Sequence, residues 1–141
     1  MDLDKINEMW KKDSVIDAVL IDQAAINIPQ LHHKYMTLHS EYSLLLKKKR
    51  LELRKIQHKK WLYYSGKAEP QDYEEEPFNH KVMKSDVANW IDVDEDVQRC
   101  ELKVEYYCAT IKTLEEILKQ VHQMSYNVKN IIEWRRFVGG V

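Results

Sequence analysis

Apolar side chains in residues 97–121 recur at alternating intervals of three and four residues. This spacing places one continuous stripe along an α-helix, and a stripe of this length needs a partner helix to cover it. Asp94 or Asp96 can cap the first turn, so we expect a helix over about residues 95–123. The stripe consists of Val97, Cys100, Val104, Tyr107, Ile111, Leu114, Leu118 and Val121.

A second segment carries a matching pattern. Its stripe slips by one position beyond Lys47, and Ser65-Gly66 supplies a stop signal, so we predict a helix over about residues 30–64 with Pro29 in its first turn. Two antiparallel helices joined by a loop would bury both stripes, which predicts a long helical hairpin. The stripe runs through Leu31, Tyr35, Leu38, Tyr42 and Leu45, then Leu46, Leu53, Ile56 and Tyr63, with Lys49 and Lys60 at two positions of its second part.

Shorter elements surround this hairpin. We expect one helix over residues 3–12 and another over residues 15–27, which Asp13-Ser14 would cap. Residues 67–93 contain Pro70, Pro77 and a run of three glutamates, which predicts an acidic loop or linker. Residues 87–93 could form a short strand, although a single strand lacks a sheet partner. Because the chain has only 3 Gly and 3 Pro, we expect few turns and an all-α single domain over residues 1–141.

The last predicted helix spans residues 126–137, with Ser125 as its cap and Gly139-Gly140 after its end. It carries more apolar and aromatic surface than a small hairpin can cover, and exposed patches of this kind usually mark subunit contacts. We therefore predict a homo-oligomer. The oligomerisation residues would be Val128, Ile131, Ile132, Trp134 and Phe137.

The net charge of −1 conceals two opposed blocks. Residues 31–67 carry 10 basic and 2 acidic side chains, whereas residues 68–96 carry 2 basic and 10 acidic ones. Each block is large enough to attract a partner of the opposite sign. No apolar run is long enough to span a bilayer and no signal peptide is evident, so we expect a soluble intracellular protein without membrane contact.

No constellation of catalytic residues has a diagnostic spacing. There is no Gly-rich phosphate loop, Cys-x-x-Cys pair or His-Glu-x-x-His motif. His32, His33 and His39 lack additional ligands at a metal-binding spacing, and Asp92-x-Asp94-x-Asp96 lacks the glycine and terminal glutamate of a calcium loop. We therefore predict no catalytic residues, no metal, no cofactor and no enzymatic activity, with a small nuclease as the least supported class.

The segment with the clearest chemistry is residues 47–60, in which eight side chains are Lys or Arg and only Glu52 is acidic. The like-charged side chains of such a helix repel each other in the free protein. A bound polyanion would neutralise them, and the counterions released from that polyanion would supply binding affinity. Aromatic residues follow at once and could stack on bases. The predicted nucleic-acid-binding residues are Lys47, Lys48, Lys49, Arg50, Arg54, Lys55, His58, Lys59, Lys60, Trp61 and Tyr64.

Two other interpretations of the charge are open. The basic helix could only solubilise a structural interaction module, or contact an acidic protein partner. The acidic loop, residues 69–76 above all, could also fold back and shield the basic helix until nucleic acid displaces it. In that case it would act as an internal competitor.

Three sequence segments together resemble one known family. They are residues 60–66 (KWLYYSG), residues 92–97 (DVDEDV) and residues 126–137 (YNVKNIIEWRRF). Their order and spacing are similar to those of the UvsY recombination mediators of T-even-like bacteriophages, and the likeness extends from about Lys11 onward.

The resemblance implies a non-enzymatic protein that binds single-stranded DNA and acts in DNA recombination, repair and replication. It also implies a ring-like oligomer, a heptamer in the family, that helps load the phage recombinase onto DNA covered by the phage single-strand-binding protein. The expected location is the cytoplasm of the infected bacterial host. The family's DNA-binding positions fall on His58 and Lys60 here. Because histidine is mostly neutral at pH 7, Lys59, Lys55 and Arg54 would have to compensate.

Overall fold

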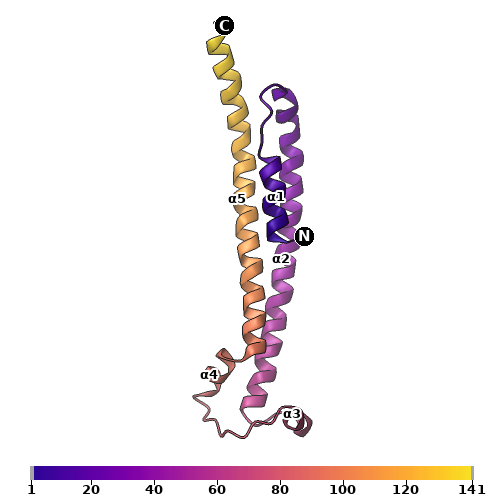
Figure 1. The fold of residues 1–141 in the computed structure, drawn as a ribbon, viewed down its shortest axis with the longest axis vertical. Helices are drawn as coiled ribbons and strands as arrows, with labels where there is room; N and C mark the ends of the chain where they lie inside the picture. Colours follow the sequence, from indigo (N-terminus) through magenta and orange to yellow (C-terminus); the bar gives the residue numbers. More distant parts are fainter. Residues whose placement is uncertain (1, 141) are drawn as a thin grey trace. The chain divides into compact units, whose positions relative to one another are not determined.

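The computed structural model describes residues 2–140, and within that range the chain forms α-helices and no strand (Figure 1). This confirms the predicted all-α fold. None of the helices in this range is long and apolar enough to cross a membrane. The helices are α1 (Leu3–Asp13), α2 (Ile21–Tyr64), α3 (Pro70–Glu75), α4 (Val87–Asp92) and α5 (Glu95–Val138).

The described residues form two compact units. The first contains the described residues up to Ser43 and from Ala109 onward, and the second contains Leu44–Cys108. Each of the two long helices therefore contributes one part to each unit.

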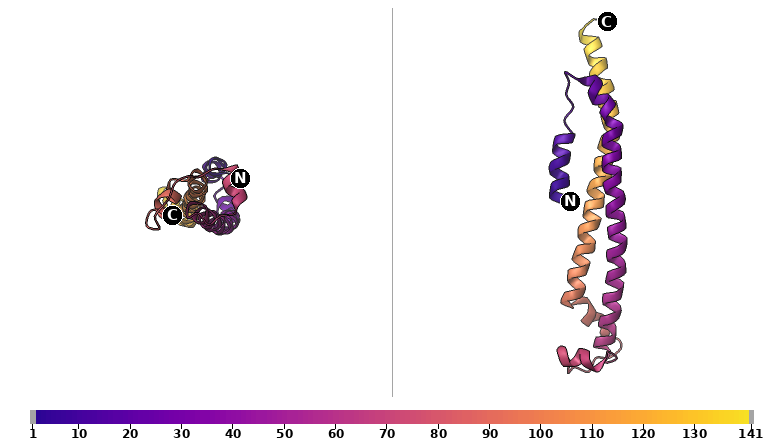
Figure 2. Two further views of the ribbon diagram at one scale, coloured as in Figure 1. Left: turned by 90° about the horizontal axis from the view of Figure 1, so that it is seen from below. Right: turned by 90° about the vertical axis from the view of Figure 1, so that its right-hand side faces the viewer.

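In the first unit, α1 lies beside the early part of α2 and the later part of α5 (Figures 1 and 2). Ile6 of α1 and Tyr35 of α2 are fully buried. The Tyr35 ring meets the Trp10 ring edge-on at 5.5 Å. The Tyr35 hydroxyl donates to Asp13 Oδ2 at 2.8 Å, and the same oxygen accepts from Lys34 Nζ at 2.6 Å. Apolar burial and satisfied polar groups thus hold α1 in place.

In the second unit, α2 ends where the sequence predicts. The Lys67 N–H donates to the Leu62 carbonyl at 2.9 Å and Gly66 adopts φ 75°. This is a Schellman ending, which needs a residue that tolerates the left-handed region. The predicted cap of α5 is also confirmed, because Asp94 Oδ1 accepts from the N–H groups of Asp96 and Val97 at 2.9 and 3.2 Å.

An aromatic cluster packs beyond the end of α2. Phe78 lies 5.2 Å from both the Tyr64 and the Trp90 ring, and Tyr63 stacks on Tyr73 at 5.2 Å. The Tyr73 hydroxyl also donates to the Tyr63 carbonyl at 2.7 Å. These contacts order the segment between α2 and α5, in which α3 and α4 are short helices.

The possible strand over residues 87–93 does not form, because most of this segment is the helix α4. Val87, Trp90 and Ile91 follow the i, i+3, i+4 pattern of one helix face, and Val87 is 4% exposed. Burying that face as a helix satisfies the backbone locally, whereas a lone strand would leave its backbone unpaired.

The predicted helix over residues 15–27 is also wrong in its first part. Residues 15–20 are not helical, and α2 begins at Ile21, so Pro29 lies inside α2. The Asp17 carboxylate accepts from the Val19 and Leu20 N–H groups at 2.9 and 3.4 Å. This local turn competes with helix formation, and the β-branched residues around it add little helix propensity.

The predicted break at Ser125 does not occur, because α5 continues to Val138. The buried stripe also shifts by one position after Tyr107, so Ile111 and Leu118 are only half-buried. Without Gly or Pro near Ser125, a continuous buried stripe carries the helix onward. The buried positions of this part are Thr110, Leu114, Ile117, Val121, Met124 and Val128.

Candidate nucleic-acid interface

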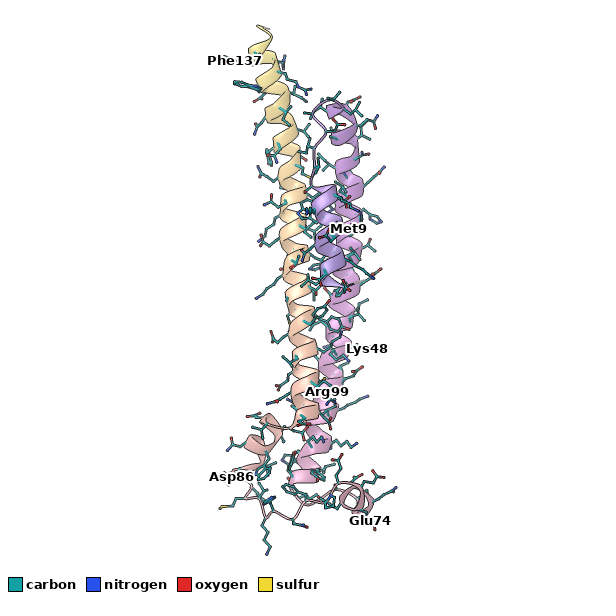
Figure 3. All side chains as sticks on the ribbon, viewed as in Figure 1. Met9, Lys48, Glu74, Asp86, Arg99 and Phe137 are labelled. Atoms are coloured by element: carbon teal, nitrogen blue, oxygen red, sulfur yellow. The ribbon has the colours of Figure 1, made fainter. Side chains whose placement is uncertain are left out.

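Six of the eight basic side chains in residues 47–60 are exposed on α2. None of the six forms an ion pair with an acidic residue in residues 2–140. Lys48 marks this part of the helix in Figure 3. We call these residues the basic face: Lys47, Lys48, Arg50, Arg54, Lys55 and Lys59.

The basic face consists of two adjacent rows. At 100° per residue, Lys47, Arg50 and Arg54 continue into His58 and Trp61 along one side of α2. Lys48, Lys55 and Lys59 form the second row beside it. The like charges stand at helical neighbour spacings, so they repel each other in the free protein and favour a bound anion.

Trp61 closes the first row as a partly exposed aromatic platform, with 41% of its surface accessible. The His58 ring stacks nearly parallel to it at 6.4 Å with an interplanar angle of 8°. Lys67 Nζ lies 4.8 Å from the centroid of the Trp61 ring. A flat ring next to a cation suits base stacking and phosphate contact together.

Two of the predicted binding residues are engaged inside the protein. Lys49 pairs with Glu52 at 2.7 Å. Lys60 is only 13% exposed at its side chain and pairs with Asp96 at 2.9 Å and Asp94 at 3.3 Å. Burial alone would lower the pKa of Lys60, but the hydrogen bonds and charges of the two carboxylates outweigh it and raise that pKa.

Tyr64 belongs to the same internal network. Its hydroxyl donates to Asp94 Oδ2 at 2.6 Å, and its ring packs on Phe78 and Trp90. The Asp94 carboxylate thereby joins the last turn of α2 to the first turn of α5. Lys60 and Tyr64 thus lie apart from the exposed basic face, where sequence reasoning had grouped them.

The acidic residues 69–76 lie close to one end of the basic face. Asp72, Glu75 and Glu76 line a cavity of about 110 Å³ together with Lys59, Lys60, Tyr63 and Asp96. Among the described residues, no acid of residues 69–76 forms an ion pair with Lys59. Shielding of the whole basic helix by this segment remains a prediction.

Sequence reasoning missed Arg99 and Lys103 on α5. They face α2 across a groove, which Lys49, Glu52, Ile56, Lys59, Lys60, Asp96 and Cys100 complete. Arg99 and Lys103 stand next to Cys100 and Val104, and residues that flank a buried seam face the partner helix, so the sequence could have indicated them. They were missed because they lie far from residues 47–60 along the chain.

The predicted oligomerisation residues divide into two groups. Val128 is 5% exposed and belongs to the core of the first unit, and Ile131 is half-buried. Ile132, Trp134 and Phe137 are 42%, 64% and 77% exposed. The Trp134 and Phe137 rings stack at 5.9 Å, and Figure 3 shows Phe137 near the end of α5.

His39, Asp94 and Asp96, which belong to the candidate metal clusters of the sequence, have other partners in the structure. His39 Nε2 lies 3.2 Å from Glu115 Oε1, and Asp94 caps α5. In the part of the chain that the structure describes, no three His, Cys, Asp or Glu side chains are grouped closely enough to hold a metal ion.

Comparison with known proteins identifies a family. Residues 9–141 match the family model described as the recombination, repair and ssDNA binding protein UvsY. The recombination protein uvsY of Enterobacteria phage T4 is 25% identical over 144 residues, which is 99% of each chain. Crystal structures of the bacteriophage T4 recombination mediator protein UvsY show the same fold.

The lattice type II structure gives a TM-score of 0.86 at 21% identity, over 99% of this chain and 98% of that chain. The lattice type IV structure gives 0.84 at 20% identity, over 97% and 98%. The resemblance found in the sequence is thus confirmed. Because the family match covers all but the first residues, the chain belongs to the UvsY family of recombination, repair and single-stranded-DNA-binding proteins.

Proposed function

We propose that this protein is a non-enzymatic recombination mediator that binds single-stranded DNA through the basic face of α2. It would work as a ring-like oligomer, a heptamer by family expectation, in the cytoplasm of an infected bacterium. Its task would be to help load the phage recombinase onto DNA covered by the phage single-strand-binding protein.

The observation that carries the proposal is the basic face itself. Six exposed cations without acidic partners among residues 2–140 follow one helix and end at a partly exposed tryptophan. Cations that neutralise phosphates release counterions, and an aromatic ring can stack on a base of any identity. This combination favours flexible single strands, whose bases are accessible, over duplex DNA.

The oligomer would make these contacts cooperative. One basic face offers only a few phosphate contacts, but a ring presents several copies, so one strand can bind many weak sites at once. The exposed apolar side chains near the end of α5 support such an assembly, since patches of this kind usually mark subunit contacts.

The handover to the recombinase needs a difference in affinity. A mediator can shift DNA from one protein to another only if it favours one state of the strand over another. We propose that wrapping over several basic faces distorts the strand, loosens the single-strand-binding protein and exposes DNA to the recombinase.

Fluorescence anisotropy with single- and double-stranded oligonucleotides at two salt concentrations tests the proposal. We expect a salt-sensitive preference for the single strand. The Arg54→Ala/Lys55→Ala variant should bind more weakly, with its salt slope reduced by about 1.4, since each lost phosphate contact removes about 0.7 on single strands.

The matched control is Lys81→Ala/Lys84→Ala, which removes the same charge from exposed positions outside the basic face. This control should keep the salt slope of the unmodified protein. Absence of single-strand binding by the unmodified protein would contradict the proposal and favour a structural interaction module.

A further inference from the structure

The groove between α2 and α5 in the second unit is a cationic site that shares one residue, Lys59, with the basic face. It has a volume of about 500 Å³. Five cationic and two acidic side chains line it, which leaves three positive charges. The cationic ones are Lys49, Lys59, Lys60, Arg99 and Lys103, and the acidic ones are Glu52 and Asp96.

The two acids are already engaged with cations of the groove. Glu52 pairs with Lys49 at 2.7 Å, and Asp96 pairs with Lys60 at 2.9 Å and with Arg99 at 3.1 Å. Within residues 2–140, Lys59 and Lys103 form no ion pair. The excess positive charge of the groove is therefore available to an anion from outside.

Arg99 has the geometry for phosphate. Its side chain is 74% exposed, and it engages Asp96 through Nη1, while the structure shows no partner for Nη2 among residues 2–140. A guanidinium that presents several donors in one plane can bind two phosphate oxygens at once. Asp96 holds this side chain at the mouth of the groove.

Lys103 links the groove to aromatic surface. Its Nζ lies 4.9 Å from the centroid of the Tyr106 ring and 5.1 Å from that of Tyr107. Both rings are partly exposed. Along α5, Arg99 and Lys103 are followed by two tyrosines, just as the cations of α2 are followed by Trp61. Cations next to aromatic rings can bind the phosphates and stack on the bases of a single strand.

Lys59 belongs to both surfaces, because it ends the second row of the basic face and also lines the groove. We propose that a bound single strand leaves α2 at Lys59 and crosses this groove, where a backbone phosphate contacts Arg99 and Lys103. The inference rests on the proposed single-strand binding and extends it from one helix to two.

The test is anisotropy with an oligo-dT strand on the full-length Arg99→Ala/Lys103→Ala variant. We expect affinity to fall roughly tenfold at 0.1 M salt and the salt slope to fall by about 1.4, as for two lost phosphate contacts. Charge-retaining Arg99→Lys/Lys103→Arg should keep the slope, and Lys81→Ala/Lys84→Ala serves as the control for charge alone. Should the double variant melt at a lower temperature, Arg99→Ala alone carries the test with a slope change of about 0.7.

The outcomes separate this inference from the proposed function. If Arg54→Ala/Lys55→Ala weakens binding but Arg99→Ala/Lys103→Ala matches the control, the crossing is wrong and the proposed function stands. If the unmodified protein binds no single strand, both fall. A parallel titration with dTMP distinguishes a site for free nucleotides. If Arg99→Ala/Lys103→Ala loses dTMP binding but binds oligo-dT like the unmodified protein, the groove is a nucleotide site and the proposal that a strand crosses it is wrong.

Discussion

Lys59 and Lys60 are neighbours in the sequence, but their environments differ. Lys59 is exposed without an ion pair in the described chain, whereas Lys60 is held between Asp94 and Asp96. We expect Lys59→Ala to weaken single-strand binding and leave the melting temperature unchanged. Lys60→Ala leaves a buried carboxylate without its cation, so it should destabilise the fold by about 1–3 kcal/mol, between the values for exposed and fully buried pairs.

Thermal denaturation followed by circular dichroism, with anisotropy on the same samples, checks this contrast. Equal melting temperatures for the two variants would show that the Lys60 ion pairs contribute nothing to stability. A Lys59→Ala variant with unchanged affinity would remove Lys59 from the binding face and, with it, the link between α2 and the groove.

Asp94 makes the stability of this network dependent on pH. Burial raises the pKa of Asp94, but the hydrogen bonds from Tyr64 and the Val97 N–H and the Lys60 charge outweigh it, so the pKa is lowered overall. A carboxyl group with a lowered pKa in the folded state stabilises the fold above its unfolded pKa. That contribution is lost as the pH falls through the lower folded pKa.

We therefore expect the free energy of unfolding to decrease as the pH falls below about 4, the unfolded pKa of an aspartate. Asp94→Asn removes the titrating group and should make this decrease shallower, while its amide oxygen can still cap α5. Urea denaturation at a series of pH values measures the slope. A slope that is the same in the variant and the unmodified protein would contradict the role given to Asp94.

At the scale of elements, α1 is a short helix whose position depends on a few contacts. Ile6 is fully buried, and removal of a buried isoleucine side chain to alanine costs about 2–5 kcal/mol. We expect Ile6→Ala to lower stability by about that amount in urea denaturation. Val19→Ala, at a position 86% exposed, is the matched control and should change it by less than about 0.5 kcal/mol. Equal stabilities would show that α1 does not contribute to the cooperative core.

The elements that the sequence predicts well are those whose signals are local. The helix from Val97 onward, its cap at Asp94 or Asp96 and the Ser65-Gly66 stop depend on residues within a few turns. The structure has the helix, a cap at Asp94 and the stop, although the buried stripe shifts by one position after Tyr107. Residues 87–93 leave helix and strand open in the sequence, because a short apolar segment fits both periods. The choice depends on Tyr64 and Phe78, which pack on Trp90 from elsewhere in the chain. Similarly, Ser125 can cap a helix or lie inside one, and the continuation of the buried stripe through Met124 and Val128 decides between the two.

In the candidate site, too, features that depend on neighbouring residues can be predicted from the sequence, and contacts between distant residues cannot. The density of positive charge in residues 47–60 is visible in the sequence, and so is the aromatic residue that follows it. The position of Lys60 on the apolar stripe is visible in the sequence, but its pairing with Asp94 is not, because that pair joins residues 34 positions apart. The same holds for Arg99 and Lys103, which reach Lys59 only after α2 and α5 have packed together.

At the scale of the whole molecule, the proposed assembly depends on the exposed apolar end of α5. Trp134 and Phe137 stack on each other and leave most of their surface accessible. Truncation at Ser125 would also remove buried Val128, so it would confuse loss of assembly with loss of core. Trp134→Ser/Phe137→Ser removes the apolar surface and leaves the core intact.

We expect this double variant to sediment as a smaller species in analytical ultracentrifugation, with an unchanged helix content. Its affinity for a long oligonucleotide should fall more than its affinity for a short one, because only a long strand gains from several linked sites. Leu102→Ser changes an apolar residue that is 71% exposed on the same helix, and it should preserve the assembly. An unchanged oligomer in the double variant would place the subunit contact elsewhere. An equal loss for short and long strands would mean that avidity does not supply the affinity.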